Sequence, residues 1–111
     1  MKILVALGGN ALGDTPEEQK ELVKHTSSSI ADLVEKGHEV VVVHGNGPQV
    51  GMIESSFETA SQVKDTIPLM PLPECGAMSQ GYIGYHLQNG LQNTFKTRKM
   101  DRNATTIVTQ T

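Results

Sequence analysis

Residues 38–51, which read HEVVVVHGNGPQVG, decide the fold of this chain. Val40 to Val43 do not alternate with polar residues, so the segment predicts a strand covered on both faces, as in a parallel sheet. A glycine-rich turn follows this strand, and Pro48 suits the first turn of a helix that we expect to run to about Gln62. A buried strand, a turn and a helix in this order indicate an α/β domain.

A similar order of elements precedes this segment. Lys2–Leu7 is continuously apolar after its lysine and predicts another buried strand. Thr15 is expected to cap a helix that has Pro16 at its first position and that ends at Gly37, where glycine favours a left-handed cap. The two strands and the helix between them therefore predict a βαβ unit with a right-handed crossover.

The remainder of the chain predicts a connection, a helix and a strand. Residues 63–74 contain three prolines and predict an irregular connection. A helix is expected from about Gly76 to Thr97, and its four glycines each weaken it by roughly 1 kcal/mol relative to alanine, so something should pack very close to it. Ala104–Thr111 is rich in β-branched residues and predicts a third strand.

Composition excludes several classes of protein. A length of 111 residues is enough for one domain, and no apolar run is long enough to span a bilayer. The single cysteine, Cys75, excludes an intrachain disulfide framework and favours a reducing, cytoplasmic setting. The net charge of −3 gives no attraction to nucleic acid. The four histidines lack the spacing of a metal site, so no metal is expected on them.

Two glycine-rich loops follow the two predicted strands. Residues 8–13 read GGNALG, and residues 44–51 read HGNGPQVG. Because parallel strands end at the same edge of a sheet, we expect the loops to lie side by side there. Glycines let backbone N–H groups approach an anion, and a helix N-terminus adds partial positive charge. The pair therefore predicts a site for a phosphate, a carboxylate or a phosphoryl group in transfer, although it matches neither the P-loop nor the dinucleotide pattern.

Three segments resemble the carbamate kinases, within the amino-acid kinase family. They are residues 5–12 (VALGGNAL), 44–51 (HGNGPQVG) and 78–85 (MSQGYIGY), and the likeness extends from Met1 to Gln110. The resemblance implies an α/β fold, a three-layer αβα sandwich with a mainly parallel sheet. It also implies a cytoplasmic, homodimeric transferase of arginine breakdown, with the helix that begins near Gly76 contributing to the dimer interface. Its reaction would transfer a phosphoryl group reversibly between ATP and carbamate, giving ADP and carbamoyl phosphate, with Mg²⁺.

The resemblance assigns one role to each loop. The first loop would contact the transferring phosphoryl group and the second would hold the carbamate. The residues concerned are Gly8, Gly9 and Asn10 in the first loop and Gly45, Asn46 and Gly47 in the second. Other amino-acid kinases carry a lysine two residues before the glycine pair, whereas this chain has Ala6, which agrees with carbamate kinase.

The cations needed for phosphoryl transfer are missing from both loops. All nine lysines and arginines lie outside them, and an unneutralised phosphoryl group would lack its main electrostatic stabilisation. In the family, the catalytic lysines and the nucleotide-binding half lie further along the chain. Residues 1–111 are therefore expected to be a truncated N-terminal part that holds one side of the active site and is inactive alone.

Two alternative functions stay open, and two side chains, His44 and Cys75, are of a chemically reactive type. The chain could be another amino-acid kinase that acts on a larger carboxylate, which Ala6 and residues 46–49 argue against, or a non-catalytic anion-binding module. His44 is expected to orient the second loop rather than to transfer a proton. Cys75 is expected to be structural, because no base is evident beside it.

Overall fold

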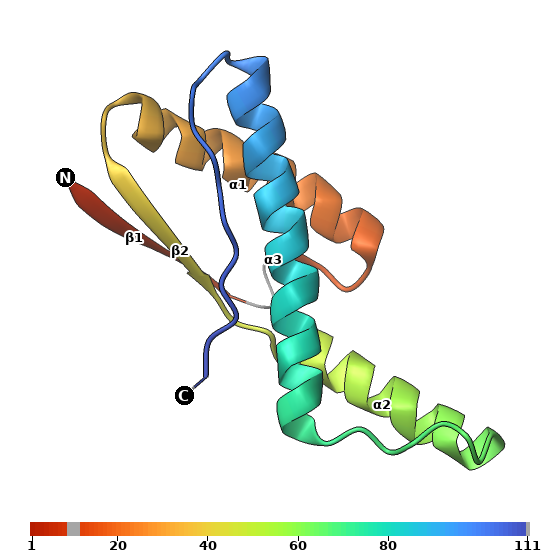
Figure 1. Cartoon of the computed structure of the whole chain (residues 1–111). Coiled ribbons are helices and arrows are strands. Elements are labelled where there is room, and N and C mark those ends of the chain that lie inside the picture. The colour runs from red at the N-terminus through yellow and green to blue at the C-terminus, as the bar shows by residue number, and fades with distance from the viewer. Residues whose placement is uncertain (9–11, 111) are drawn as a thin grey trace.

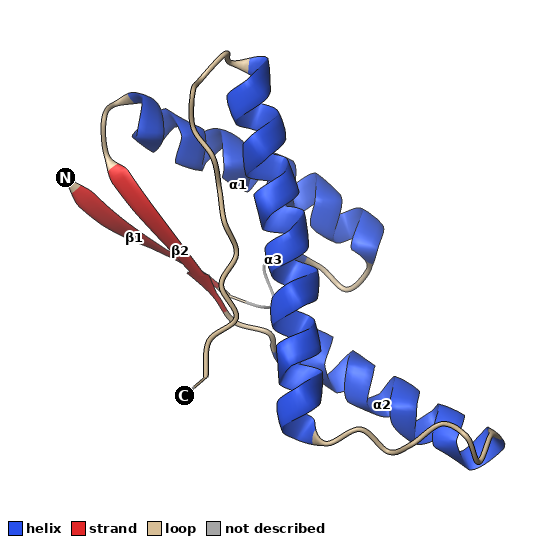
Figure 2. Ribbon diagram, in the orientation of Figure 1, coloured by secondary structure: helices blue, strands red, loops and turns tan. Residues whose placement is uncertain are grey.

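The computed structural model describes residues 1–8 and 12–110. In chain order its elements are β1 (Lys2–Leu7), α1 (Pro16–Glu35), β2 (Glu39–His44), α2 (Gly47–Val63) and α3 (Leu72–Thr97). The two strands lie side by side, α1 and α3 cross each other, and α2 extends away from the end of the sheet (Figure 1 and Figure 2). Within the described ranges, no helix has both the length and the apolar character needed to cross a membrane.

The two strands form a parallel pair. Lys2 lies opposite Glu39 and Leu7 lies opposite His44. The Gly45 N–H continues the ladder past the strand ends by donating to the Leu7 carbonyl at 2.9 Å. With α1 between the two strands in the sequence, the predicted βαβ unit is confirmed, and both loops start at the same edge of the sheet.

The ends of α1 are set by local sequence, as predicted. The Thr15 hydroxyl accepts a hydrogen bond from the Glu18 N–H at 3.2 Å, and Pro16 occupies the first turn. The Glu18 carboxylate in turn accepts from the Asp14 N–H at 2.8 Å, which satisfies a second backbone donor ahead of the helix. Gly37 follows the helix with φ +89°, the left-handed conformation that favours glycine.

The core lies between α1, α3 and one face of the sheet. Its buried side chains come from both helices and from the turn after β1, and they are Leu12, Val23, Ile83, Leu87, Ile30, Ala31, Leu91 and Phe95. Val40 and Val42 pack against this layer from β2. Apolar burial of this kind is the main favourable contribution to folding.

Two glycines of α3 meet a close neighbour, as the sequence predicted. A Cβ at Gly90 would collide with Val23 and Ser27 of α1, and one at Gly84 would collide with Thr106. The other two glycines of this helix would meet nothing within 4 Å in the described part of the chain, so for them the expectation of close packing is wrong here. Close backbone approach therefore explains half of the glycines in α3.

The third helix begins earlier than predicted. It starts at Leu72, not near Gly76, with Pro71 as its N-cap residue and Pro73 in its first turn. The first-turn N–H groups of a helix have no partner inside the helix, so a proline there removes nothing. The irregular connection is therefore shorter than its prolines suggest.

Only one face of the sheet is covered, which corrects the expectation from the valine run. Leu4, Val41 and Val43 are 66%, 62% and 44% exposed on the outer face. The side chains on the inner face pack against α1 and α3, which lie on the same side. The described residues thus form the sheet and one helical layer of an αβα arrangement.

The predicted third strand does not form in the described residues. Residues 104–110 pass between β2 and α3 without strand geometry (Figure 1). The Gln80 side chain accepts from the Thr109 N–H at 2.8 Å and donates to its carbonyl at 3.1 Å, and the Thr106 hydroxyl donates to Gly84 O at 3.0 Å. A strand needs a backbone ladder. Here the backbone partner is a glutamine side chain, so β-branched composition gives an extended segment only. Thr111 lies outside the described residues.

Candidate functional site

Gly8 and Gly45, the first described glycines of the two loops, lie next to each other at the carboxyl edge of the sheet. Gly8 follows β1 directly, and Gly45 follows β2 and bonds back to the end of β1. A Cβ at Gly8 or at Gly47 would meet nothing within 4 Å, so the backbone at both positions is open to approach. Gly9 and Asn10, the other candidate phosphoryl-binding residues, lie outside the described residues. Among the described candidates, the structure brings Gly8 close to Gly45, and Asn46 and Gly47 follow Gly45 directly in the sequence.

Asn46 is the N-cap residue of α2 but does not cap it. Its side chain makes no hydrogen bond to the first turn of the helix, and that turn contains no acidic residue. An asparagine in this position typically stabilises a helix by about 1 kcal/mol through such a bond. Instead, Asn46 Nδ2 donates to the Ser79 hydroxyl oxygen at 2.7 Å. The partial positive charge at the start of α2 is therefore not balanced by its own first-turn side chains.

Gln49 joins the two loops. Its Nε2 donates to the Gly13 carbonyl at 3.3 Å, and the residue is only 3% exposed. Gly13 has φ +80°, which favours glycine, and it sits beside a small pocket of about 240 Å³. The pocket is lined by Gly13, Asp14, Pro48, Gln49 and Met52. Sequence reasoning assigned no role to Gln49 or Ser79, although both stand inside the segments that carry the family resemblance.

Neither His44 nor Cys75 is arranged as a reactive group. His44 Nδ1 lies 3.0 Å from the Gly45 carbonyl, which can only accept, so Nδ1 carries the proton and the ring braces the loop. Cys75 is fully buried, and its Sγ contacts the Met70 carbonyl at 3.6 Å. Burial, and after it two nearby glutamates, raise the pKa of this thiol and disfavour the thiolate.

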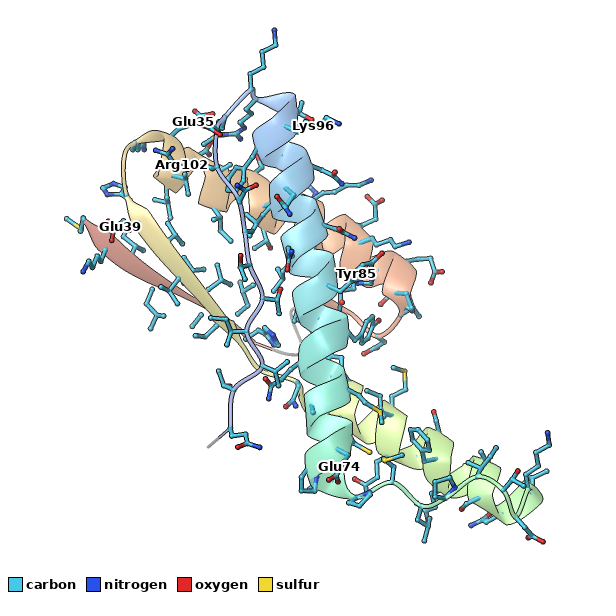
Figure 3. All side chains as sticks on the ribbon, in the orientation of Figure 1. Glu35, Glu39, Glu74, Tyr85, Lys96 and Arg102 are labelled. Atoms are coloured by element: carbon cyan, nitrogen blue, oxygen red, sulfur yellow. The ribbon has the colours of Figure 1, made fainter. Side chains whose placement is uncertain are left out.

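The described part of the site provides dipoles, and neither loop contains a lysine or arginine. Lys96 and Arg102 lie near the C-terminal end of α3, whereas Glu74 marks its other end (Figure 3). Across residues 1–8 and 12–110, no group of three or more histidine, cysteine or carboxylate side chains is placed to hold a metal ion. Backbone N–H groups, an asparagine amide and a helix N-terminus can bind an anion, but they do not neutralise a phosphoryl group in transfer.

The chain belongs to the amino acid kinase family, whose sequence profile matches residues 1–107. Within that family it is similar to carbamate kinases. It is 55% identical over 109 residues to the carbamate kinase of Staphylococcus epidermidis, which is 98% of this chain and 35% of that protein. It is 52% identical, over the same shares, to a carbamate kinase-like protein of Escherichia coli. The chain thus spans about a third of the length of these relatives.

The fold is also that of solved carbamate kinases. The Giardia lamblia carbamate kinase bound to AMP-PNP superposes with a TM-score of 0.82 at 39% identity, over 92% of this chain and 36% of that one. The predicted fold class is therefore confirmed, as the N-terminal portion of a larger αβα architecture. The described residues form one of the two helical layers of such a sandwich, and the apolar outer face of the sheet is the side that lacks one.

Proposed function

We propose that residues 1–111 form the N-terminal part of a carbamate kinase and carry one side of its active site. The complete polypeptide would transfer a phosphoryl group reversibly between ATP and carbamate, giving ADP and carbamoyl phosphate. The observation that carries this proposal is the pair of adjoining loops at the carboxyl edge of the sheet, with the uncapped start of α2 beside them. The similarity to carbamate kinases over 98% of the chain supports the choice of substrate.

We assign one part of the substrate to each of the two loops. Gly8, with Gly9 and Asn10 after it, would contact the transferring phosphoryl group, whose charge is spread over several oxygens. Gly45, Asn46 and Gly47 would hold the carbamate end, with open backbone at Gly47 and the positive end of α2 facing the carboxylate. Among the described residues, neither His44 nor Cys75 is arranged as a nucleophile, so we expect no covalent intermediate. The chain's own contribution is to position the reactants and to supply hydrogen bonds.

The charge needed for transfer would come from outside this segment. All nine lysines and arginines lie outside both loops, and the described residues present no carboxylate cluster that fits Mg²⁺. We therefore place the catalytic lysines, the nucleotide and its Mg²⁺ on the rest of the polypeptide, and residues 1–111 alone would not turn over. The AMP-PNP bound to the Giardia relative supports a nucleotide of the ATP type.

The proposed enzyme is a homodimer that works in the cytoplasm, in the breakdown of arginine through carbamoyl phosphate. The exposed face of α3 supports the dimer, because Tyr85 is 62% exposed and a Cβ at Gly81 would meet nothing within 4 Å. Helical glycines on an open face permit close approach of a second helix. The single, buried cysteine suits a reducing compartment.

The decisive experiment is an assay of the complete polypeptide that carries these residues, with ADP, Mg²⁺ and carbamoyl phosphate. ATP formation, followed with luciferase, is expected. Asn46→Ala should raise the KM for carbamoyl phosphate, whereas Lys24→Ala, on an exposed turn of α1, should leave it unchanged.

Two results would reject the proposed function. Phosphorylation of an amino-acid carboxylate without ATP formation from carbamoyl phosphate would indicate another amino acid kinase. Calorimetric binding of carbamoyl phosphate by residues 1–111, with no turnover by the complete polypeptide, would indicate a non-catalytic anion-binding module.

A further inference from the structure

One hydrogen bond joins the candidate substrate loop to the middle of the molecule. Asn46 Nδ2 donates to Ser79 Oγ at 2.7 Å, across 33 positions of sequence. Ser79 lies on α3 and is completely buried. The loop that follows β2 is therefore fixed to a helix that also packs against α1, α2 and the inner face of the sheet.

The second hydrogen bond of Ser79 sets the direction of this contact. The Ser79 hydroxyl donates its single proton to the Gly76 carbonyl at 2.7 Å, within its own helix. Towards Asn46 it can therefore act only as an acceptor. Only the NH₂ end of the Asn46 amide satisfies it, and the flipped amide would place two acceptors face to face.

Fixing the amide determines what the loop can offer a ligand. One Nδ2 hydrogen of Asn46 is committed to Ser79, which leaves the Oδ1 acceptor and the second Nδ2 hydrogen. Oδ1 accepts no hydrogen bond from the described part of the chain, and the side chain does not cap α2. One acceptor and one donor side by side complement a group that has both an N–H and an oxygen, as a carbamoyl group has.

We propose that Ser79 is a positioning residue for the substrate site, because it holds the Asn46 amide in the one orientation that presents Oδ1 to the amino group of carbamate or carbamoyl phosphate. This inference rests on the proposed function. It adds to it a residue of α3 that does not touch the substrate, and it predicts preference for a carbamoyl group over an acyl group that lacks an N–H.

The test is a double-mutant cycle in the complete polypeptide. Ser79→Ala should raise the KM for carbamoyl phosphate about three- to tenfold, the range expected for one misaligned neutral hydrogen bond, while kcat changes less than about twofold. In an Asn46→Ala background, Ser79→Ala should cause no further rise, because the effect travels through Asn46. Ser79→Ala alone should also lower the preference for carbamoyl phosphate over acetyl phosphate by about the same factor as it raises the KM.

The chain supplies a matched control. Ser27 is also completely buried, but its hydroxyl has no hydrogen-bond partner among residues 1–8 and 12–110, and it lies in the middle of α1. Ser27→Ala removes the same oxygen from the core and should leave both the KM and the preference unchanged. An unchanged KM in Ser79→Ala, or an equal rise in the Asn46→Ala background, overturns the proposal.

The proposal and the function on which it rests fail separately. If the unmodified polypeptide makes no ATP from ADP and carbamoyl phosphate, the proposed function is wrong. Solvent exchange of the Asn46 side-chain NH₂, measured by ¹⁵N NMR, then decides the role of Ser79. The exchange should be about tenfold faster in Ser79→Ala than in the unmodified chain or Ser27→Ala. Equal rates in the three proteins would show that Ser79 does not hold the amide.

Discussion

Replacing Gly90 by alanine tests how closely α3 approaches α1. In the interior of a helix, alanine is more favourable than glycine by about 0.5–1 kcal/mol. At Gly90 the new methyl group would enter the space of the Val23 side chain and of the Ser27 hydroxyl. These neighbours are 2% and 0% exposed, so neither can move into solvent.

The expected net effect follows from these two contributions. Overpacking by one methyl group in a well-packed core costs about 1–3 kcal/mol, and the helix gain offsets part of it. Gly90→Ala should therefore lower the free energy of unfolding by up to about 2 kcal/mol. Gly81→Ala is the matched control on the same helix. Its Cβ would meet nothing within 4 Å in this chain, so it should raise the free energy of unfolding by about 0.5–1 kcal/mol.

Urea unfolding of residues 1–111, followed by far-UV circular dichroism, measures both changes. The two variants should differ by about 1–3 kcal/mol, with Gly81→Ala the more stable. Equal stabilisation by both substitutions would show that α1 and α3 are not in close contact at Gly90. Destabilisation by both would show that alanine is unfavourable in α3 for a reason other than packing.

Three further substitutions test other parts of the structure. Burial first, and the positive charge of Lys20 second, lower the pKa of His86 below its usual 6.5. The folded chain therefore binds a proton at His86 less readily than the unfolded chain does. The free energy of unfolding is unaffected above about pH 6.5 and falls as the pH drops from there towards the folded pKa. His86→Gln should reduce that loss, measured as the change in urea midpoint from about pH 7.5 to about pH 5.5, and an unchanged loss would contradict it. Arg98 joins α3 to two carboxylates of α1, so Arg98→Ala should cost about 1 kcal/mol and less in high salt; no change in thermal midpoint would contradict this. We expect a second helical layer to cover the outer sheet face in the complete polypeptide, whereas Val41 is 62% exposed in the described segment. Val41→Lys should therefore strongly destabilise the complete polypeptide but barely affect residues 1–111; equal effects on the two thermal midpoints would argue against a second helical layer.

The features that the sequence predicted correctly are those fixed by neighbouring residues. The cap at Thr15, the proline after it and the left-handed Gly37 each act within one turn of helix. Their effect on the ends of α1 therefore does not depend on distant parts of the chain. The parallel pair was predictable because apolar strands separated by a helix have few other ways to bury themselves. The adjacency of the two loops then follows from topology.

The features that the sequence could not predict depend on partners distant in the chain. Residues 104–110 have strand-like composition, but the partner available to Thr109 is the Gln80 side chain, which a local pattern does not reveal. The contact between Asn46 and Ser79 could not be predicted from the sequence either, because each residue has an ordinary local explanation. An asparagine before a helix usually caps it, and a helical serine usually bonds its own backbone, as Ser79 also does.

The valine run shows why an apparently wrong prediction can still carry information. Four successive valines indicate two covered faces, yet Val41 and Val43 are exposed among residues 1–110. Exposing such side chains is unfavourable by about 25 cal/mol per Å² of apolar surface, and no local requirement of a strand demands it. The similar carbamate kinases are about three times as long, so in those proteins sequence outside the matched segment is available to cover this face. We therefore expect the valine pattern to describe the complete fold, whereas the exposure of Val41 and Val43 describes the segment alone.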